Sequence, residues 1–480
     1  MLTSISLKLA ISKMALNFLQ LDFIKRLRST SSLNKLAIRG AVWTISGYGS
    51  SQILRFGSNL ILTRLLFPEL FGLMGLVNVF LSILGLFSDL GINVSIVQSK
   101  RGDDPDFLNT AWTLQCLRGV FLWLGCCGIA YPVSQFYREP RLVWLIPLVG
   151  ITFLIGGFNS TSLATLNRHL SVKSLALFEL SGQIIGLAVT LTWAWLSPSI
   201  LALLAGGFAS AILQLILSHR LNGKIRNRFA WDRSAVKELI SFGKWILLST
   251  AIYFLSSSTD RLILGKLFTL KLLGVYGIAL MLSSLPSQIV NALGSKVLYP
   301  TYSKIAELPR SEFRTKIVRY RQPLLIVLAV AVALLVGTGD LMIGFLYDKR
   351  YTAATWMLPM LAVGIWPLVL VNTIDQALLA LGKPMYWTFG SFLSFLCYAI
   401  GIPLGYYSSL HEVGAILAVA VSNVPIWFVV IYGLWREKIL ALRQDLLMTA
   451  LFLAILSLVI AIRMSIGFGS PFDGLFTIAH

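Results

Sequence analysis

Residues 60–76 read LILTRLLFPELFGLMGL, and residues 262–278 read LILGKLFTLKLLGVYGI. The two stretches align without a gap and are identical at seven of seventeen positions. Arg64, Gly72 and Gly75 of the first copy are matched, 202 positions later, by a lysine and two glycines. Because ungapped glycines and a basic residue match by chance less often than leucines do, the pattern indicates an internal duplication of the chain.

The chain around these copies is strongly apolar. It has 480 residues, of which 56% are hydrophobic and 12% are charged, whereas ordinary soluble domains have about 25% charged residues. A helix crosses the hydrocarbon core of a bilayer with about 20 apolar residues, and runs such as 323–337 (PLLIVLAVAVALLVG) and 446–462 (LLMTALFLAILSLVIAI) recur almost from end to end. A transmembrane β-barrel would instead show short alternating segments. The sequence therefore predicts an all-α polytopic membrane protein.

Hydropathy and helix-breaking residues divide the chain into about 12–13 transmembrane helices. The expected spans are 41–66, 72–98, 107–132, 143–165, 174–197, 200–219, 242–267, 273–298, 322–346, 353–380, 386–408, 413–434 and 445–466. Residues 1–40 precede the first span, are rich in Lys and Arg, and are expected to form a cytoplasmic tail, part of it an amphipathic helix on the membrane surface.

The distribution of basic residues predicts the orientation. If the amino terminus is cytoplasmic, the tail and the inside loops carry 27 of the 40 Lys and Arg residues, and the outer side carries seven. This bias follows the positive-inside rule. The net charge of +20 is thus explained by membrane orientation. Nucleic-acid binding is not expected, because no soluble basic face is present.

The duplication predicts how the spans are arranged. Its copies begin in spans 1 and 7, an even number of crossings apart, so the repeat is parallel and relates two halves about an axis along the membrane normal. We expect two parallel-repeat six-helix bundles around a central cavity. An internal repeat of this kind favours a transporter that rocks one half against the other. The expected domains are a basic tail (1–40), an amino-terminal lobe (41–219), an inter-lobe loop (220–241), a carboxy-terminal lobe (242–434) and an extra helix with a tail (435–480).

Several motifs resemble those of bacterial polysaccharide flippases, which belong to the multidrug/oligosaccharidyl-lipid/polysaccharide exporter superfamily. The motifs, which lie between residues 40 and 440, are Ala41-Val42-Trp43, the run from Leu62 to Leu73 (LTRLLFPELFGL), Asp89-Leu90-Gly91, Val97-Gln98, Phe136-Tyr137, Leu166-Asn167-Arg168, Tyr299-Pro300-Thr301-Tyr302-Ser303 and Gly382-Lys383. The thirteenth span departs from the family's common core of twelve crossings.

The resemblance implies a function in the cytoplasmic (inner) membrane of a bacterium. It implies a flippase that moves polyprenyl-pyrophosphate-linked oligosaccharide repeat units to the outer leaflet by alternating access, for O-antigen, capsule or exopolysaccharide synthesis. No covalent chemistry is required, so we expect no enzyme activity and no cofactor. Membrane lipids and polysaccharide polymerase machinery are the expected partners, and the protein is expected to function as a monomer.

Ionisable residues within spans are costly and usually functional. A pyrophosphate needs cations, and guanidinium groups bind it with forked hydrogen bonds. Arg55, Arg118 and Arg261 are therefore the candidate substrate-binding residues. The acids Asp89, Asp260 and Asp375 are candidates for binding a coupling proton or sodium ion. The alternative for all six residues is internal ion pairing that fixes helix packing.

Two other functions remain open. A cation-coupled multidrug exporter of the same superfamily would have an acidic cavity, which the arginines disfavour. A membrane-embedded polysaccharide polymerase or ligase would carry a large outer loop, and the expected outer loops are short. The sequence has no grouping typical of a catalytic or metal site, and its four cysteines fall in apolar segments, where they are expected to be packing residues.

Overall fold

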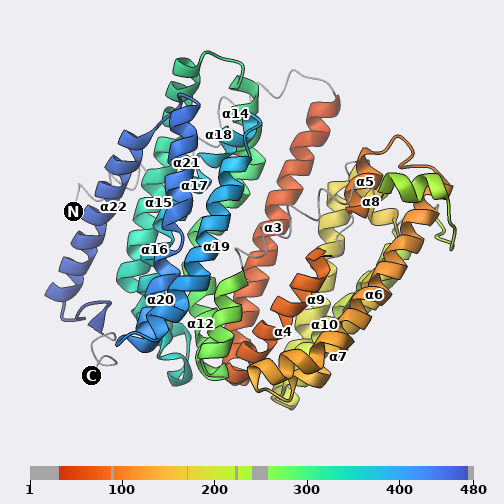
Figure 1. The fold of residues 1–480 in the computed structure, drawn as a ribbon, viewed down its shortest axis with the longest axis horizontal. Helices are drawn as coiled ribbons and strands as arrows, with labels where there is room; N and C mark the ends of the chain where they lie inside the picture. Colours follow the sequence, from red (N-terminus) through yellow and green to blue (C-terminus); the bar gives the residue numbers. More distant parts are fainter. Residues whose placement is uncertain (1–31, 88–90, 170, 222–224, 240–257, 474–480) are drawn as a thin grey trace.

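The computed structural model describes residues 32–87, 91–169, 171–221, 225–239 and 258–473. In these ranges the regular structure is helical, and the helices form two lobes that meet at one end and lie apart at the other (Figure 1). Asp89 and nearly all of the expected basic tail lie outside the described residues.

The amino-terminal lobe includes eight helices in the described ranges. They are α3 (Ser32–Leu65), α4 (Pro68–Phe87), α5 (Ile92–Gln98), α6 (Pro105–Tyr137), α7 (Leu142–Gly157) with α8 (Ser162–Arg168), α9 (Val172–Leu196) and, packed on α9, α10 (Ile200–Arg220). The expected second span is not one continuous helix. Gly91, at a φ of 58°, precedes α5 in a left-handed conformation that glycine adopts without strain.

The carboxy-terminal lobe begins, in the described part, with a helical segment at 258–267. It continues with α12 (Leu270–Ser283), α13 (Leu285–Leu293), η2 (Gly294–Leu298), α14 (Tyr299–Ile305), α15 (Arg310–Leu346), η3 (Lys349–Tyr351), α16 (Ala354–Gly364), α17 (Trp366–Asn372), α18 (Asp375–Ala380), α19 (Met385–Tyr406), α20 (His411–Val421), α21 (Val424–Arg436) and α22 (Leu442–Ser465).

The described helices account for most of the 12–13 expected spans. Within the described ranges, nine helices are long and apolar enough to cross a membrane, or up to eleven if each of two bent pairs is one span. The bent pairs are α7 with α8, at 61°, and α12 with α13, at 45°. Helix α3 corresponds to the first expected span but is more polar than these, and the seventh span is described only from residue 258.

The duplication is visible in the structure. Helix α4 begins at Pro68 and α12 begins at Leu270, which are equivalent positions of the repeat. Proline is favoured at the first position of a helix because its missing N–H needs no partner there. In the second copy, Thr269 supplies the helix start instead, since its hydroxyl accepts a hydrogen bond from the N–H of Leu272 at 3.2 Å. Different residues thus start equivalent helices in the two lobes.

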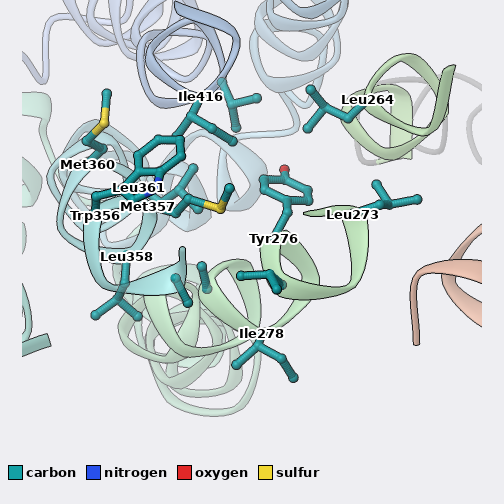
Figure 2. Packing of buried hydrophobic residues seen from close by; sticks show 14 of the residues in the cluster. Leu264, Leu273, Tyr276, Ile278, Trp356, Met357, Leu358, Met360, Leu361 and Ile416 are labelled. Carbon is teal, nitrogen blue, oxygen red and sulfur yellow. The ribbon is translucent and has the colours of Figure 1, made fainter. Parts of the chain in front are cut away.

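The largest described core lies in the carboxy-terminal lobe. Side chains of α12, α16 and α20 surround the fully buried Tyr276, among them Leu273, Met357 and Ile416 (Figure 2). Large apolar side chains such as Trp195 and Phe345 are exposed on the outside of the helices. This is the pattern of a chain whose surface faces lipid and whose lobes have their own packed interiors.

Candidate translocation cavity and its closure

A cavity of about 610 Å³ lies between the two lobes. Its walls come from α3, α4, α7 and α10 on one side, and from 258–267 and α12 on the other. Most lining residues are apolar. The polar ones in the described part are Asn59, Asn78, Thr152, Tyr276 and Arg261. Arg261 carries the only charge among these described lining residues, so the cavity has a cationic point on a largely apolar wall.

The structure places Arg261 beside Asp260 but gives the two side chains different surroundings. Arg261 is exposed to the cavity, whereas Asp260 is buried and accepts a hydrogen bond from the hydroxyl of Tyr276. The repeat equivalent of Arg261 is Asn59, which also lines the cavity. The charge at this position is therefore specific to the carboxy-terminal lobe.

Arg55 lies on α3 one turn before Asn59, on the face that looks toward the other lobe. The amide of Gln52 donates a hydrogen bond to Gln288 of α13 at 2.9 Å, and the hydroxyl of Tyr347 donates one to Asn59 at 3.2 Å. Residues three and four apart share a helix face, so Arg55 lies between these two inter-lobe contacts. Its side chain is exposed, although it is not among the residues that line the cavity.

Arg118 has a different environment from the other two arginines. Its guanidinium donates a hydrogen bond to the carbonyl oxygen of Gly85 at 2.9 Å, which ties α6 to the end of α4. The side chain is half-buried and does not line the cavity. The structure thus brings Arg261 to the cavity and Arg55 to the space between the lobes, and it leaves Arg118 against the backbone of its own lobe.

The two predicted coupling acids that the structure describes, Asp260 and Asp375, lie in different helical segments and have different hydrogen-bond partners. Asp375 is the first residue of α18, where the tenth span is interrupted, and its carboxylate accepts from the side chain of Gln376 at 3.2 Å. Asn372, at the end of α17, is 1% exposed, and both polar atoms of its side chain lack a hydrogen-bond partner among the described residues. Asp375 does not line the cavity that Arg261 faces.

Two equivalent glycines close one end of the cavity. A Cβ atom on Gly72 of α4 would lie 2.1 Å from the carbonyl oxygen of Leu270, and a Cβ atom on Gly274 of α12 would lie 2.0 Å from that of Pro68. These four residues are two pairs related by the repeat. The axis of the repeat therefore passes between α4 and α12, whose backbones touch because neither glycine has a side chain.

Reciprocal hydrogen bonds reinforce this closure. Tyr137, at the end of α6, donates to the carbonyl oxygen of Leu262 at 3.0 Å. In the opposite direction, Tyr347, just after α15, donates to Asn59 of α3. Each lobe thus uses a tyrosine from the end of its third span to hold the first span of the other lobe.

Arg350 adds a charged contact at the same end. Its guanidinium donates to the carbonyl oxygens of Thr63 and Arg64, both at 3.0 Å, and it lies over the ring of Phe67 at 5.2 Å. These carbonyls are at the carboxyl end of α3, where a cation is favoured. We call this end outer, following the orientation predicted from the basic residues. At the inner end, among the described residues, no hydrogen bond or ion pair joins the loops of the two lobes.

The sequence interpretation missed two ion pairs between α15 and α22, one fully buried and one partly buried. Arg321, expected at the edge of an inside loop, lies within α15 and is fully buried against Asp445 of α22. Arg463 of α22 pairs with Asp340 of α15 at the other end of the same two helices. Asp340 and Arg463 fall in the ninth and thirteenth expected spans, both of which are apolar. Their opposite charges were the sequence feature that could have predicted this pair. No sequence feature indicated that Arg321 would be buried.

This arrangement defines the fold of two-lobed helical membrane transporters. A lipid II flippase MurJ in an inward closed conformation has the same fold, with a TM-score of 0.67, 13% identity, and coverage of 91% of this chain and 96% of that one. An inward-facing multidrug resistance MATE family transporter of the MOP superfamily gives a TM-score of 0.62 at 13% identity, over 79% and 94% of the two chains.

The sequence identifies the family. Residues 61–356 match the profile of the family described as "Polysaccharide biosynthesis protein", and the chain belongs to this family of multi-pass bacterial membrane proteins. It is 23% identical to the teichuronic acid biosynthesis protein TuaB of Bacillus subtilis (strain 168) over 309 residues, and this alignment covers 64% of each chain. It is 23% identical to the lipopolysaccharide biosynthesis protein WzxC of Escherichia coli (strain K12), over 58% of this chain and 56% of WzxC. The chain thus aligns with between half and two thirds of the length of these relatives.

Proposed function

We propose that this protein is a flippase for polyprenyl-pyrophosphate-linked oligosaccharide repeat units, without enzyme activity. It moves them across the bacterial cytoplasmic membrane for the synthesis of a surface polysaccharide such as O-antigen, capsule or exopolysaccharide. The observation that carries the proposal is the cavity between two repeat-related lobes, with Arg261 as its charged lining residue. Membership of the polysaccharide biosynthesis family and the fold shared with a lipid II flippase support it.

The geometry suits alternating access. The lobes are joined at the outer end through Gly72, Gly274 and the reciprocal tyrosines, so a headgroup in the cavity would enter from the inner side. Arg261 and Arg55 would bind the pyrophosphate, because guanidinium groups form forked, charge-assisted bonds with phosphate oxygens. The polyprenyl tail would stay in lipid. The protein would act as a monomer with its amino terminus in the cytoplasm and deliver its product to the polymerase machinery.

Loss of either arginine should reduce transport. Arg261→Gln and Arg55→Gln are each expected to lower the rate of repeat-unit export by about 10- to 100-fold, because a hydrogen bond to a charged group contributes about 1.5–3 kcal/mol. The measurement is recovery of the surface polysaccharide in a strain that lacks the gene. Arg64→Gln, an exposed cation at the end of the same α3 helix, should restore the polysaccharide fully.

The alternative function, a multidrug exporter, predicts a different phenotype for a strain that lacks the gene. A deletion strain with normal polysaccharide and increased sensitivity to cationic drugs would contradict the flippase proposal. The absence of a carboxylate from the described cavity lining argues against a drug-cation site. Export at the wild-type rate by Arg261→Gln, and by the double variant Arg261→Gln with Arg55→Gln, would contradict the proposed role of the arginines. The flippase function itself would then be decided by the deletion strain.

We also propose that Asp260 or Asp375, or Asp89 in the part not described, couples transport to a proton or sodium gradient. Asp375→Asn is expected to lower gradient-driven uptake of the lipid-linked substrate into inverted vesicles by at least tenfold, since an amide binds neither ion in the way a carboxylate does. Asp106→Asn, an exposed acid in the first turn of α6, is the matched control and should have no effect. If uptake by the wild-type protein depended on neither the proton gradient nor the sodium gradient, the proposed coupling would be contradicted.

A further inference from the structure

The segment between the lobes is bound along the side of α6. We call residues 225–239 the strap. The backbone N–H groups of Arg228, Ala230 and Asp232 donate hydrogen bonds to side-chain oxygens of Asn109, Thr113 and Thr110, at 3.0–3.1 Å. Every second residue of an extended stretch is thus attached to the helix. The described part of the inter-lobe connection is therefore an ordered element of the amino-terminal lobe.

One side of the strap is buried or paired. Ala235 is fully buried in a cluster of apolar side chains from α5 and α6. Asp232 accepts from Arg101 at 2.8 Å, and the guanidinium of Arg101 together with the Ser234 hydroxyl lowers the pKa of Asp232 to about 2. Because this pKa is below that of the unfolded chain, the pair contributes stability at neutral pH and loses it progressively as the pH falls from the ordinary carboxyl value of 3.8 through about 2. Glu238 accepts from Ser99 at 2.6 Å.

The other side of the strap is cationic and aromatic. Its exposed side chains are Arg226, Arg228, Phe229, Trp231, Arg233 and Lys237, together with Ser234 and Glu238. Phe229 is 69% exposed and Trp231 is 57% exposed. Within the described part of the chain, no ion pair joins an acid to any of these four cations. Asp232 pairs with Arg101, and Glu238 keeps its negative charge while its carboxylate accepts a hydrogen bond from the Ser99 hydroxyl. The exposed side chains therefore present four positive charges and two large rings, against one negative charge on Glu238.

The position of the strap points this face toward lipid. In Figure 1 the strap is the lime-green segment at the side of the amino-terminal lobe that is farther from the carboxy-terminal lobe, at the same end as α5 and α8. Helix α6 has 33 residues, about 50 Å at 1.5 Å per residue, and is longer than the hydrocarbon core of about 30 Å. The strap contacts the first turns of α6, so we infer that it lies near the headgroups at this end, and it does not line the cavity.

We propose that the exposed face of the strap is a docking surface for anionic phospholipid headgroups of the inner leaflet. Arginine binds phosphate oxygens with paired donors, and tryptophan favours the boundary between hydrocarbon and water. A basic residue near an anionic membrane surface contributes about 1 kcal/mol, which is roughly fivefold in binding. The strap would thus anchor the inner end of the amino-terminal lobe to the membrane surface. The proposal does not depend on the transported substrate.

The test uses the fluorescence of Trp231 in the full-length protein. The protein is placed in nanodiscs of phosphatidylethanolamine and phosphatidylglycerol, with either lipid brominated on its acyl chains, and the signal of Trp231 is the difference between wild type and Trp231→Phe. We expect brominated phosphatidylglycerol to quench Trp231 about 5- to 30-fold more effectively than brominated phosphatidylethanolamine, as one or two arginines would contribute. Changing Arg226, Arg228, Arg233 and Lys237 to Gln should reduce this preference to about one.

Two further variants make the result specific. Changing Lys304, Arg314, Arg319 and Lys383 to Gln removes the same charge from exposed positions of the carboxy-terminal lobe and should leave the preference at Trp231 intact. Replacing the three strap arginines by Lys should retain most of the preference for phosphatidylglycerol. That result would show that changes at these positions do not detach the strap from α6. Equal quenching by both lipids in the wild type, or no quenching by either because another protein segment covers Trp231, would overturn the proposal. Loss of the preference in the carboxy-terminal control would overturn it as well.

Discussion

Arg321→Met is expected to lower the free energy of unfolding of the protein by about 3–5 kcal/mol, because it leaves a buried carboxylate without its counter-charge. Arg321 and Asp445 are 0% and 2% exposed, and the Nη1 and Oδ1 atoms are 2.5 Å apart. The same guanidinium donates to Thr373 Oγ1 and to the carbonyl oxygen of Leu370, both at 2.6 Å. Trp427 donates to the second oxygen of Asp445 at 3.1 Å. The expected readout is a large decrease in the midpoint of unfolding in mild detergent.

Two controls separate the lost pair from a general effect of charge. Arg319→Met, at an exposed position two residues earlier on α15, is expected to change the unfolding free energy by less than about 0.5 kcal/mol. The double change Arg321→Met with Asp445→Leu removes both charges and is expected to recover most of the stability, because no unpaired charge remains. An Arg321→Met protein as stable as the wild type would contradict the assignment of this pair.

The Arg321–Asp445 pair attaches the thirteenth span, α22, to the carboxy-terminal lobe. Helix α22 is bound to α15 by Arg321 and Asp445 near one end and by Asp340 and Arg463 near the other. Its side chains Phe452 and Leu456 belong to the same buried cluster as apolar residues of α15. We therefore expect α22 to move as one body with the carboxy-terminal lobe. The division of the chain at residue 435 remains a prediction.

Much of the fold could be predicted because its determinants are local. Apolar runs of about 20 residues define spans wherever they occur, and the repeat indicated two parallel lobes. The break before α5 was missed because its cause is the backbone conformation of Gly91, at a φ of 58°. Arg321 was missed because the burial of a charge depends on a partner 124 residues away. Spacing along one sequence contains no information on such a pairing.

The site was predictable to a smaller extent. An arginine within a span indicates a polar surface or a partner, and the sequence cannot distinguish them. Arg261 lines the cavity, whereas Arg118 donates to the backbone of Gly85, although both were expected to bind substrate. The repeat marked Gly72 and Gly274 as equivalent. That the two glycines also touch each other across the lobes follows only from the position of the repeat axis.

Gly274→Ala is expected to prevent the outer end of the protein from closing. The added methyl group would lie 2.0 Å from the carbonyl oxygen of Pro68, which belongs to the backbone of α4 and cannot turn away as a flexible side chain can. Gly72→Ala would produce the equivalent clash with Leu270, at 2.1 Å. Overpacking of this kind costs about 1–3 kcal/mol, and only the closed state carries the cost. The population should therefore shift toward an outward-open state by about 5- to 150-fold.

The measurement is the distance between spin labels on the two lobes, in a background without the native cysteines. Labels at Ser197 and Ser409, both exposed at the outer end, should move apart in Gly274→Ala, whereas labels at Asn167 and Lys383, at the inner end, should approach each other. The repeat supplies its own control. Gly75 and Gly277 lie three residues further along the same helices, and a Cβ atom on either would meet nothing within 4 Å. Alanine at these positions should leave both distances unchanged. If Gly274→Ala also left them unchanged, the contact between the glycines would not hold the outer end closed, and the reciprocal tyrosines with Arg350 would have to do so alone.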